Sequence, residues 1–80
     1  MSEADRIREV LMQIARGRSD DCTFCPSEAA RRLSDDWRSF MPRVREVAAE
    51  LMKEGKLVCT QRGEAAHPLT TRGAIRLART

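Results

Sequence analysis

The stretch DDWRSFMPRVREVAAELM, residues 35–52, decides the fold because it has the pattern of one amphipathic helix with a proline in its middle. Proline lacks an N–H and suits the first turn of a helix better than its interior. We therefore predict that Pro42 begins a helix over residues 42–54, after a one-turn segment that carries Trp37 and Phe40. Gly55 ends this helix, and its inward face is formed by Val44, Val47, Ala48, Leu51 and Met52.

Two further helices are predicted on the N-terminal side. Ser2 is a good N-cap, and the apolar residues Ile7, Val10, Leu11 and Ile14 then recur at helical spacing, so we expect a helix over residues 3–16 that Gly17 ends. Pro26 suits the first position of a second helix over residues 26–33. Between them, Thr23 and Phe24 favour extended geometry and predict a very short strand.

The C-terminal part of the chain has the pattern of a hairpin. Residues 56–61 and 74–79 alternate apolar and polar side chains and predict two strands, while the glycines and the proline of residues 62–73 predict a long loop between them. The fold class is therefore mainly α with a small antiparallel sheet. The order of three helices and a hairpin is that of a winged helix-turn-helix, with residues 62–73 as the wing and residues 1–80 as one domain.

Composition excludes several classes of protein. The 80 residues are 41% hydrophobic and 34% charged, which is typical of a small globular domain. No apolar run approaches the ~20 residues of a membrane span, and the charged start MSEADRIREV is unlike a secretory signal, so a cytoplasmic location is expected. No catalytic triad, phosphate loop or nucleotide fingerprint is present, which predicts a binding module and not an enzyme.

Four segments of the chain carry a resemblance to a known family: TFCPSEAARRL, DDWRSFMPRVREVAAEL, GKLVCTQRGE and TRGAIRLAR. Together, and in this order, they resemble the short bacterial proteins catalogued as domain of unknown function 3253, over about Ile7 to Arg79. The resemblance implies a winged-helix fold. It implies no established activity and no functional residues.

The distribution of charge favours nucleic-acid binding. The net charge is +3, and beyond residue 55 the only acidic side chain is Glu64. In a winged helix the third helix usually enters the major groove of double-stranded DNA and the wing lies along the neighbouring backbone. The predicted phosphate-binding residues are therefore Arg43 and Arg45 on the helix and Arg62, Arg72 and Arg76 on or beside the wing.

The outward face of the predicted third helix opposes that interpretation. Its centre is formed by Glu46, Ala49, Glu50 and Lys53, with a net charge of −1, and phosphates would repel the glutamates. The alternative function is a protein-interaction module, either docking to another protein or forming a homodimer, with Met12 on the outward side of the first helix as an apolar contact. The simplest alternative is an ordinary solvated face.

The cysteines raise a zinc and a redox hypothesis. Cys22 and Cys25 have C-x2-C spacing, and Cys59 with His67 would complete four ligands. We favour free thiols and predict no metal or cofactor, because Cys59 and His67 do not form a compact second pair and Cys59 lies on the inward face of its strand. A redox pair would need a βαβ context that the chain lacks.

The remaining candidate sites have structural explanations. Trp37, Phe40 and Met41 stand at helical spacing and are expected to pack between the second and third helices, not to form a binding patch. The doublets Asp20-Asp21 and Asp35-Asp36 precede helices and are expected to act as caps. His67 is expected to be a solvated residue of the wing.

Overall fold

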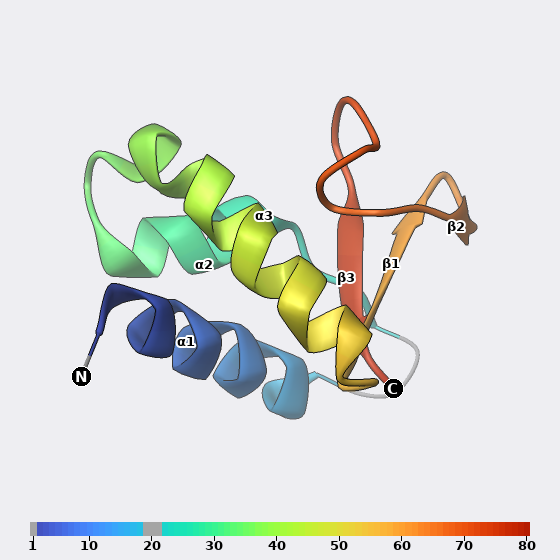
Figure 1. The fold of residues 1–80 in the computed structure, drawn as a ribbon, viewed down its shortest axis with the longest axis horizontal. Helices are drawn as coiled ribbons and strands as arrows, with labels where there is room; N and C mark the ends of the chain where they lie inside the picture. The colour runs from blue at the N-terminus through green and yellow to red at the C-terminus, as the bar shows by residue number, and fades with distance from the viewer. Residues whose placement is uncertain (1, 19–21) are drawn as a thin grey trace.

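Three helices are followed by a small antiparallel sheet, an arrangement consistent with a winged helix. The computed structural model describes residues 2–18 and 22–80. The elements are α1 (Glu3–Gly17), α2 (Pro26–Leu33), α3 (Trp37–Lys53), β1 (Leu57–Gln61), β2 (Glu64–Ala65) and β3 (Arg76–Arg79). The three helices pack against one another, and the sheet stands beside the C-terminal half of α3 (Figure 1). No helix in the described part of the chain is long and apolar enough to cross a membrane.

The first two helices and their caps agree with the sequence pattern. Ser2 caps α1 in a capping box, because its hydroxyl accepts the N–H of Asp5 at 3.1 Å and the Asp5 carboxylate accepts the N–H of Ser2 in return. Pro26 is the first residue of α2. The short strand expected at residues 23 and 24 is a single bridge, in which Phe24 and Leu77 exchange both backbone hydrogen bonds at 2.8 Å. The doublet Asp20-Asp21 lies outside the described residues.

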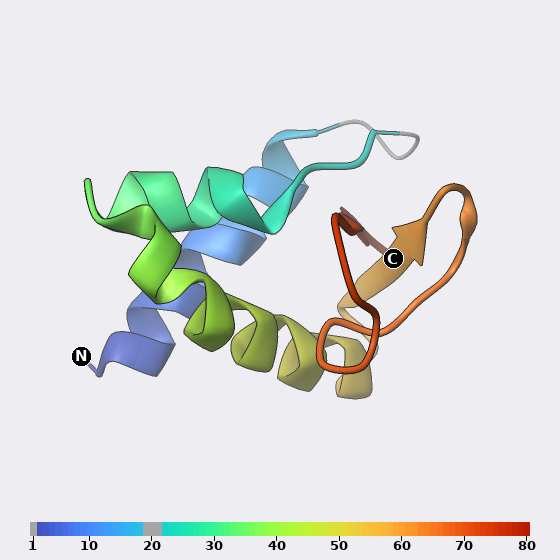
Figure 2. The ribbon, with the colours of Figure 1, turned by 90° about the horizontal axis from the view of Figure 1, so that it is seen from above.

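The prediction that Pro42 begins the third helix is wrong. Helix α3 begins at Trp37, and Pro42 lies inside it. The helix tolerates the proline because Pro42 is exposed and because the preceding turn packs Trp37, Phe40 and Met41 against the core. Figure 2 shows α3 changing direction after its first turns, as expected for a helix that contains proline.

The sheet contains a strand that the sequence pattern did not predict. Arg62 and Gly63 have φ values of 54° and 82° and form a two-residue turn that pairs Gln61 with Glu64, so β2 begins inside the predicted loop. Strand β1 is central, with the order β2-β1-β3. Strand β3 begins at Arg76, two residues later than predicted. At residue 74 the carbonyl accepts a hydrogen bond from the side chain of Gln61 at 3.1 Å, which takes the place of a backbone bond between strands.

One core joins the helices to the sheet. Its fully buried side chains include Ile7, Leu11, Leu51, Ile75 and Leu77, each 0% exposed. The hypothesis that Met12 offers an outward apolar contact is wrong, because Met12 is half-buried and packs against this core. Phe40 and Trp37 also pack against it, as expected.

An ion pair between Arg8 on α1 and Glu54 at the end of α3 predicts a pH-dependent contribution to stability. The two terminal guanidinium nitrogens of Arg8, Nη1 and Nη2, donate to the Glu54 carboxylate, and these hydrogen bonds lower the pKa of Glu54 from its ordinary value of 4.5. A carboxyl whose pKa falls on folding stabilises the folded state above its unfolded pKa, and that stabilisation is lost as pH falls through the lowered value.

We therefore expect Glu54→Gln to lower the melting temperature slightly at pH 7, and the difference from wild type to disappear well below pH 4.5, as followed by circular dichroism. The control is Glu64→Gln, since Glu64 makes no ion pair within the described residues. A difference that persists unchanged in acid would contradict this role for Glu54.

Candidate functional site

The return loop, residues 66–75, connects β2 to β3 and lies against α3 (Figure 2). Arg45 holds it there: its guanidinium donates to the carbonyl oxygens of Pro68 at 3.2 Å, Thr71 at 3.0 Å and Gly73 at 2.6 Å. A planar guanidinium can bridge several carbonyls at once, which an ammonium does less well. Three of the five N–H donors of Arg45 are therefore used inside the molecule, and its main role is to fix the return loop.

Arg76 is engaged in a similar way. Its Nε donates to the Thr23 hydroxyl at 2.9 Å and its Nη2 to the Thr23 carbonyl at 3.0 Å. These bonds fasten the start of β3 to the segment that precedes α2. The sequence pattern does not reveal them, because Thr23 and Arg76 lie 53 positions apart.

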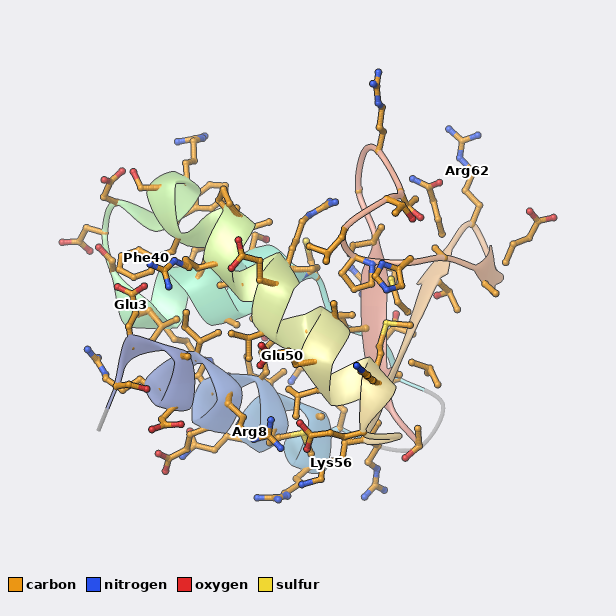
Figure 3. The ribbon with its side chains drawn as sticks, viewed as in Figure 1. Glu3, Arg8, Phe40, Glu50, Lys56 and Arg62 are labelled. Carbon is orange, nitrogen blue, oxygen red and sulfur yellow. The ribbon has the colours of Figure 1, made fainter. Side chains whose placement is uncertain are left out.

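The other three predicted arginines lie at the surface. Arg43 is exposed, and its Nε lies 3.6 Å from the carboxylate of Glu3. Arg62 projects from the hairpin turn into solvent (Figure 3), and Arg72 is exposed on the return loop. Within residues 2–18 and 22–80 the Arg62 and Arg72 side chains make no hydrogen bond or ion pair. Their cationic groups are thus available to an anion.

A groove between the start of α2 and the return loop, here named the arginine groove, has a volume of about 890 Å³. Its lining contains Arg45 and Arg72 and no carboxylate. Pro26 and Ser27 line one side, so the positive end of the α2 dipole faces the groove. The Ser27 hydroxyl, which donates to the Cys25 sulfur at 3.1 Å, lines it as well. The electrostatics of this groove favour an anionic ligand.

Two arginines that the sequence analysis did not single out lie beside the arginine groove. The guanidinium carbons of Arg31 and Arg38 each lie 4.5 Å from the centroid of the Trp37 ring, and Trp37 lines the groove. Cation–π contacts hold these charges in place at the corner between α2 and α3. The sequence could have indicated the contact between Trp37 and Arg38, because these residues are neighbours in the chain. It could not have indicated the contact with Arg31, because that contact depends on how α2 and α3 pack.

A second groove, here named the acidic groove, lies between α3 and the return loop and has a volume of about 640 Å³. It is lined by Glu46, Ala49, Glu50, Met52, Lys53, His67 and Leu69. This lining includes the four residues of α3 that were predicted to form its outward face. The return loop therefore borders the surface that a recognition helix would present to DNA. Leu69 is 56% exposed.

His67 is exposed, as expected, but it is also part of the structure of the return loop. The ring Nδ1 of His67 accepts a hydrogen bond from the backbone N–H of Leu69 at 3.2 Å. The backbone N–H of His67 donates to the Thr71 hydroxyl at 2.9 Å. These bonds give the tip of the return loop a defined shape.

The cysteines occupy ordinary structural positions. Cys25 is the N-cap residue of α2, and Cys59 is buried in β1. Burial raises the pKa of the Cys59 thiol, which favours its protonated form. Across residues 2–18 and 22–80 no group of three or more His, Cys, Asp or Glu side chains is arranged to hold a metal ion.

Asp36 is the N-cap of α3, although its carboxylate accepts the Ser39 hydroxyl at 2.6 Å and no backbone N–H.

Comparisons with known proteins bear on the family of the chain. A comparison with curated proteins gave no match. The model of one family, described as "Protein of unknown function (DUF3253)", matches residues 4–80. This match includes α2, α3, the whole sheet and all but the first residue of α1. The chain therefore belongs to the DUF3253 family of proteins of unknown function.

Proposed function

We propose that this protein is a binding module for double-stranded DNA and contacts its phosphates along the arginine groove. The observation that carries the proposal is the lining of that groove, which contains two arginines and the start of α2 but no carboxylate. Phosphates bind well at helix N-termini and to arginine side chains. Arg72 in the groove and the exposed Arg62 on the hairpin turn would supply the direct phosphate contacts. Arg31, Arg38 and Arg43, which pairs with Glu3, would add to the positive field.

Arg45 and Arg76 have a different part in this proposal. Three of the five N–H donors of Arg45 and two of the five of Arg76 are bonded within the molecule, so these residues would mainly position the return loop and β3. The glutamates of the acidic groove oppose insertion of α3 into a DNA groove. Binding would therefore use the phosphate backbone and show little dependence on base sequence. The proposal describes a cytoplasmic binding protein and not an enzyme.

The test is fluorescence anisotropy of a labelled mixed-sequence duplex at about 50 and 200 mM salt. We expect a dissociation constant in the range of about 10⁻⁶ to 10⁻⁴ M that weakens steeply with salt, as for sequence-independent phosphate contacts. If Arg62 and Arg72 each neutralise one phosphate, R62A/R72A should reduce the slope of log affinity against log salt by about 1.8.

The matched control is R6A/R16A, which removes the same charge from α1. Both side chains are exposed, and neither makes a hydrogen bond or ion pair within the described residues. If this control loses as much affinity as R62A/R72A, binding depends on net charge and the arginine groove is not the site. No binding at about 50 mM salt would remove the proposal altogether.

A further inference from the structure

The acidic groove combines features that do not fit phosphate binding. Leu69 is 56% exposed. Among the described residues the only other exposed large hydrophobic side chain is Val58, at 44%. The apolar parts of Ala49 and Met52 lie in the same lining, so the groove offers a small apolar surface in the middle of a charged one. An exposed apolar patch rimmed by polar residues is typical of a protein-binding surface.

The carboxylates of the acidic groove indicate that its partner carries a positive charge. Glu46 and Glu50 are one helical turn apart on α3, where like charges repel. Neither side chain makes a hydrogen bond or ion pair within the described part of the chain, although Glu50 also interacts electrostatically with Arg8 on α1. Lys53 is the one cation in the lining and balances one of the two negative charges. A cationic group that enters the groove would relieve the remaining repulsion.

The groove is held open by contacts within the molecule. One wall is α3, which is packed on the core through Val47, Ala48 and Leu51. The other wall is the return loop, which Arg45 and the hydrogen bonds of His67 hold in a defined shape. A partner would therefore meet a preformed surface, which reduces the entropy lost on binding.

We infer that the acidic groove binds a helical segment of a partner protein that carries an apolar side chain and, one turn away on the same face, a lysine or arginine. The apolar side chain packs on Leu69, Ala49 and Met52, while the cation pairs with Glu46 and Glu50. Helix-in-groove recognition uses anchors at this spacing. The two grooves share Leu69 in their linings but differ in their charged residues, so the occupant of the acidic groove has the opposite charge to a nucleic acid.

The experiment uses ¹⁵N-labelled protein and a synthetic helical peptide of about 15 residues, in which leucines and lysines one turn apart form one face. Titration followed by ¹H–¹⁵N spectra should move the amide signals of Ala49, Lys53 and Leu69 most. E46Q/E50Q and, separately, Leu69→Ser should each raise the dissociation constant about tenfold, because one loses the charge pairing and the other the apolar contact. A peptide with glutamates in place of the lysines should not bind.

The matched control is E9Q/E64Q, which removes the same charge from α1 and the hairpin. Glu9 accepts only a 3.5 Å hydrogen bond from Gln13, and Glu64 has no ion pair among the described residues. Affinity should be unchanged in this control. The inference is overturned if millimolar lysine peptide moves no signals at the groove, if E46Q/E50Q binds like wild type, or if the spectra show that a second copy of the chain occupies the groove. DNA binding is measured separately, so its failure would not affect this result.

Discussion

Phe24→Ala is expected to lower the free energy of unfolding by ~3–5 kcal/mol, the usual cost of truncating a buried phenylalanine. Phe24 is 1% exposed and is among the largest fully buried side chains of the domain. Its backbone also exchanges two hydrogen bonds with Leu77, so the residue joins the segment before α2 to the last strand. A domain of this size has a total stability of about 4–12 kcal/mol, so the variant should lose a large part of its stability at 25 °C.

Urea denaturation followed by Trp37 fluorescence measures this effect. The control is Leu69→Ala, which removes an apolar side chain that is 56% exposed and should change stability by less than about 0.5 kcal/mol. If Phe24→Ala costs less than about 1 kcal/mol, the side chain is not the centre of the contact between helices and sheet.

Arg45→Ala should release the return loop and lower the free energy of unfolding by ~2 kcal/mol, because three carbonyl groups lose a charged donor in a partly exposed site. The local effect should be larger than the global one. The backbone N–H of Thr71 donates to His67 within the loop, and its hydrogen exchange should accelerate by about tenfold or more when the loop detaches. Hydrogen exchange followed by NMR measures both.

Two further variants test the geometry of this contact. Arg45→Lys should recover little of the loss, because an ammonium cannot reach three carbonyl groups in one plane as a guanidinium does. Arg43→Ala removes an exposed arginine of the same helix and should leave the loop amides protected. If the lysine variant protects them fully, charge alone and not the shape of Arg45 holds the loop.

The parts of the fold that depend on local signals could be predicted from the sequence. The start of α1 follows from Ser2 and Asp5, and that of α2 from Pro26, because capping and proline geometry involve only neighbouring residues. The start of α3 could not be predicted in this way. The preference of Pro42 for a first turn is local, whereas the packing of Trp37 and Phe40 that overrides it is tertiary.

The candidate site was predicted only as a set of charges. The arginines of the third helix and the wing have similar sequence surroundings, yet Arg45 and Arg76 donate hydrogen bonds within the molecule, while the Arg62 and Arg72 side chains make none among the described residues. Contacts over 23 to 53 positions of the chain make that difference. The acidic stripe on the third helix was predicted, because helical periodicity places it, but the loop that turns it into a groove was not.

The contact between Arg45 and the return loop has a consequence for variation in this protein. Arg45 bonds to main-chain oxygens of Pro68, Thr71 and Gly73, groups that every residue type possesses. The path of the loop is therefore largely independent of the side chains at positions such as 69, 70 and 72. Those positions can exchange charge, size or polarity while the backbone keeps its course, so the same scaffold can present different surface chemistries to different ligands.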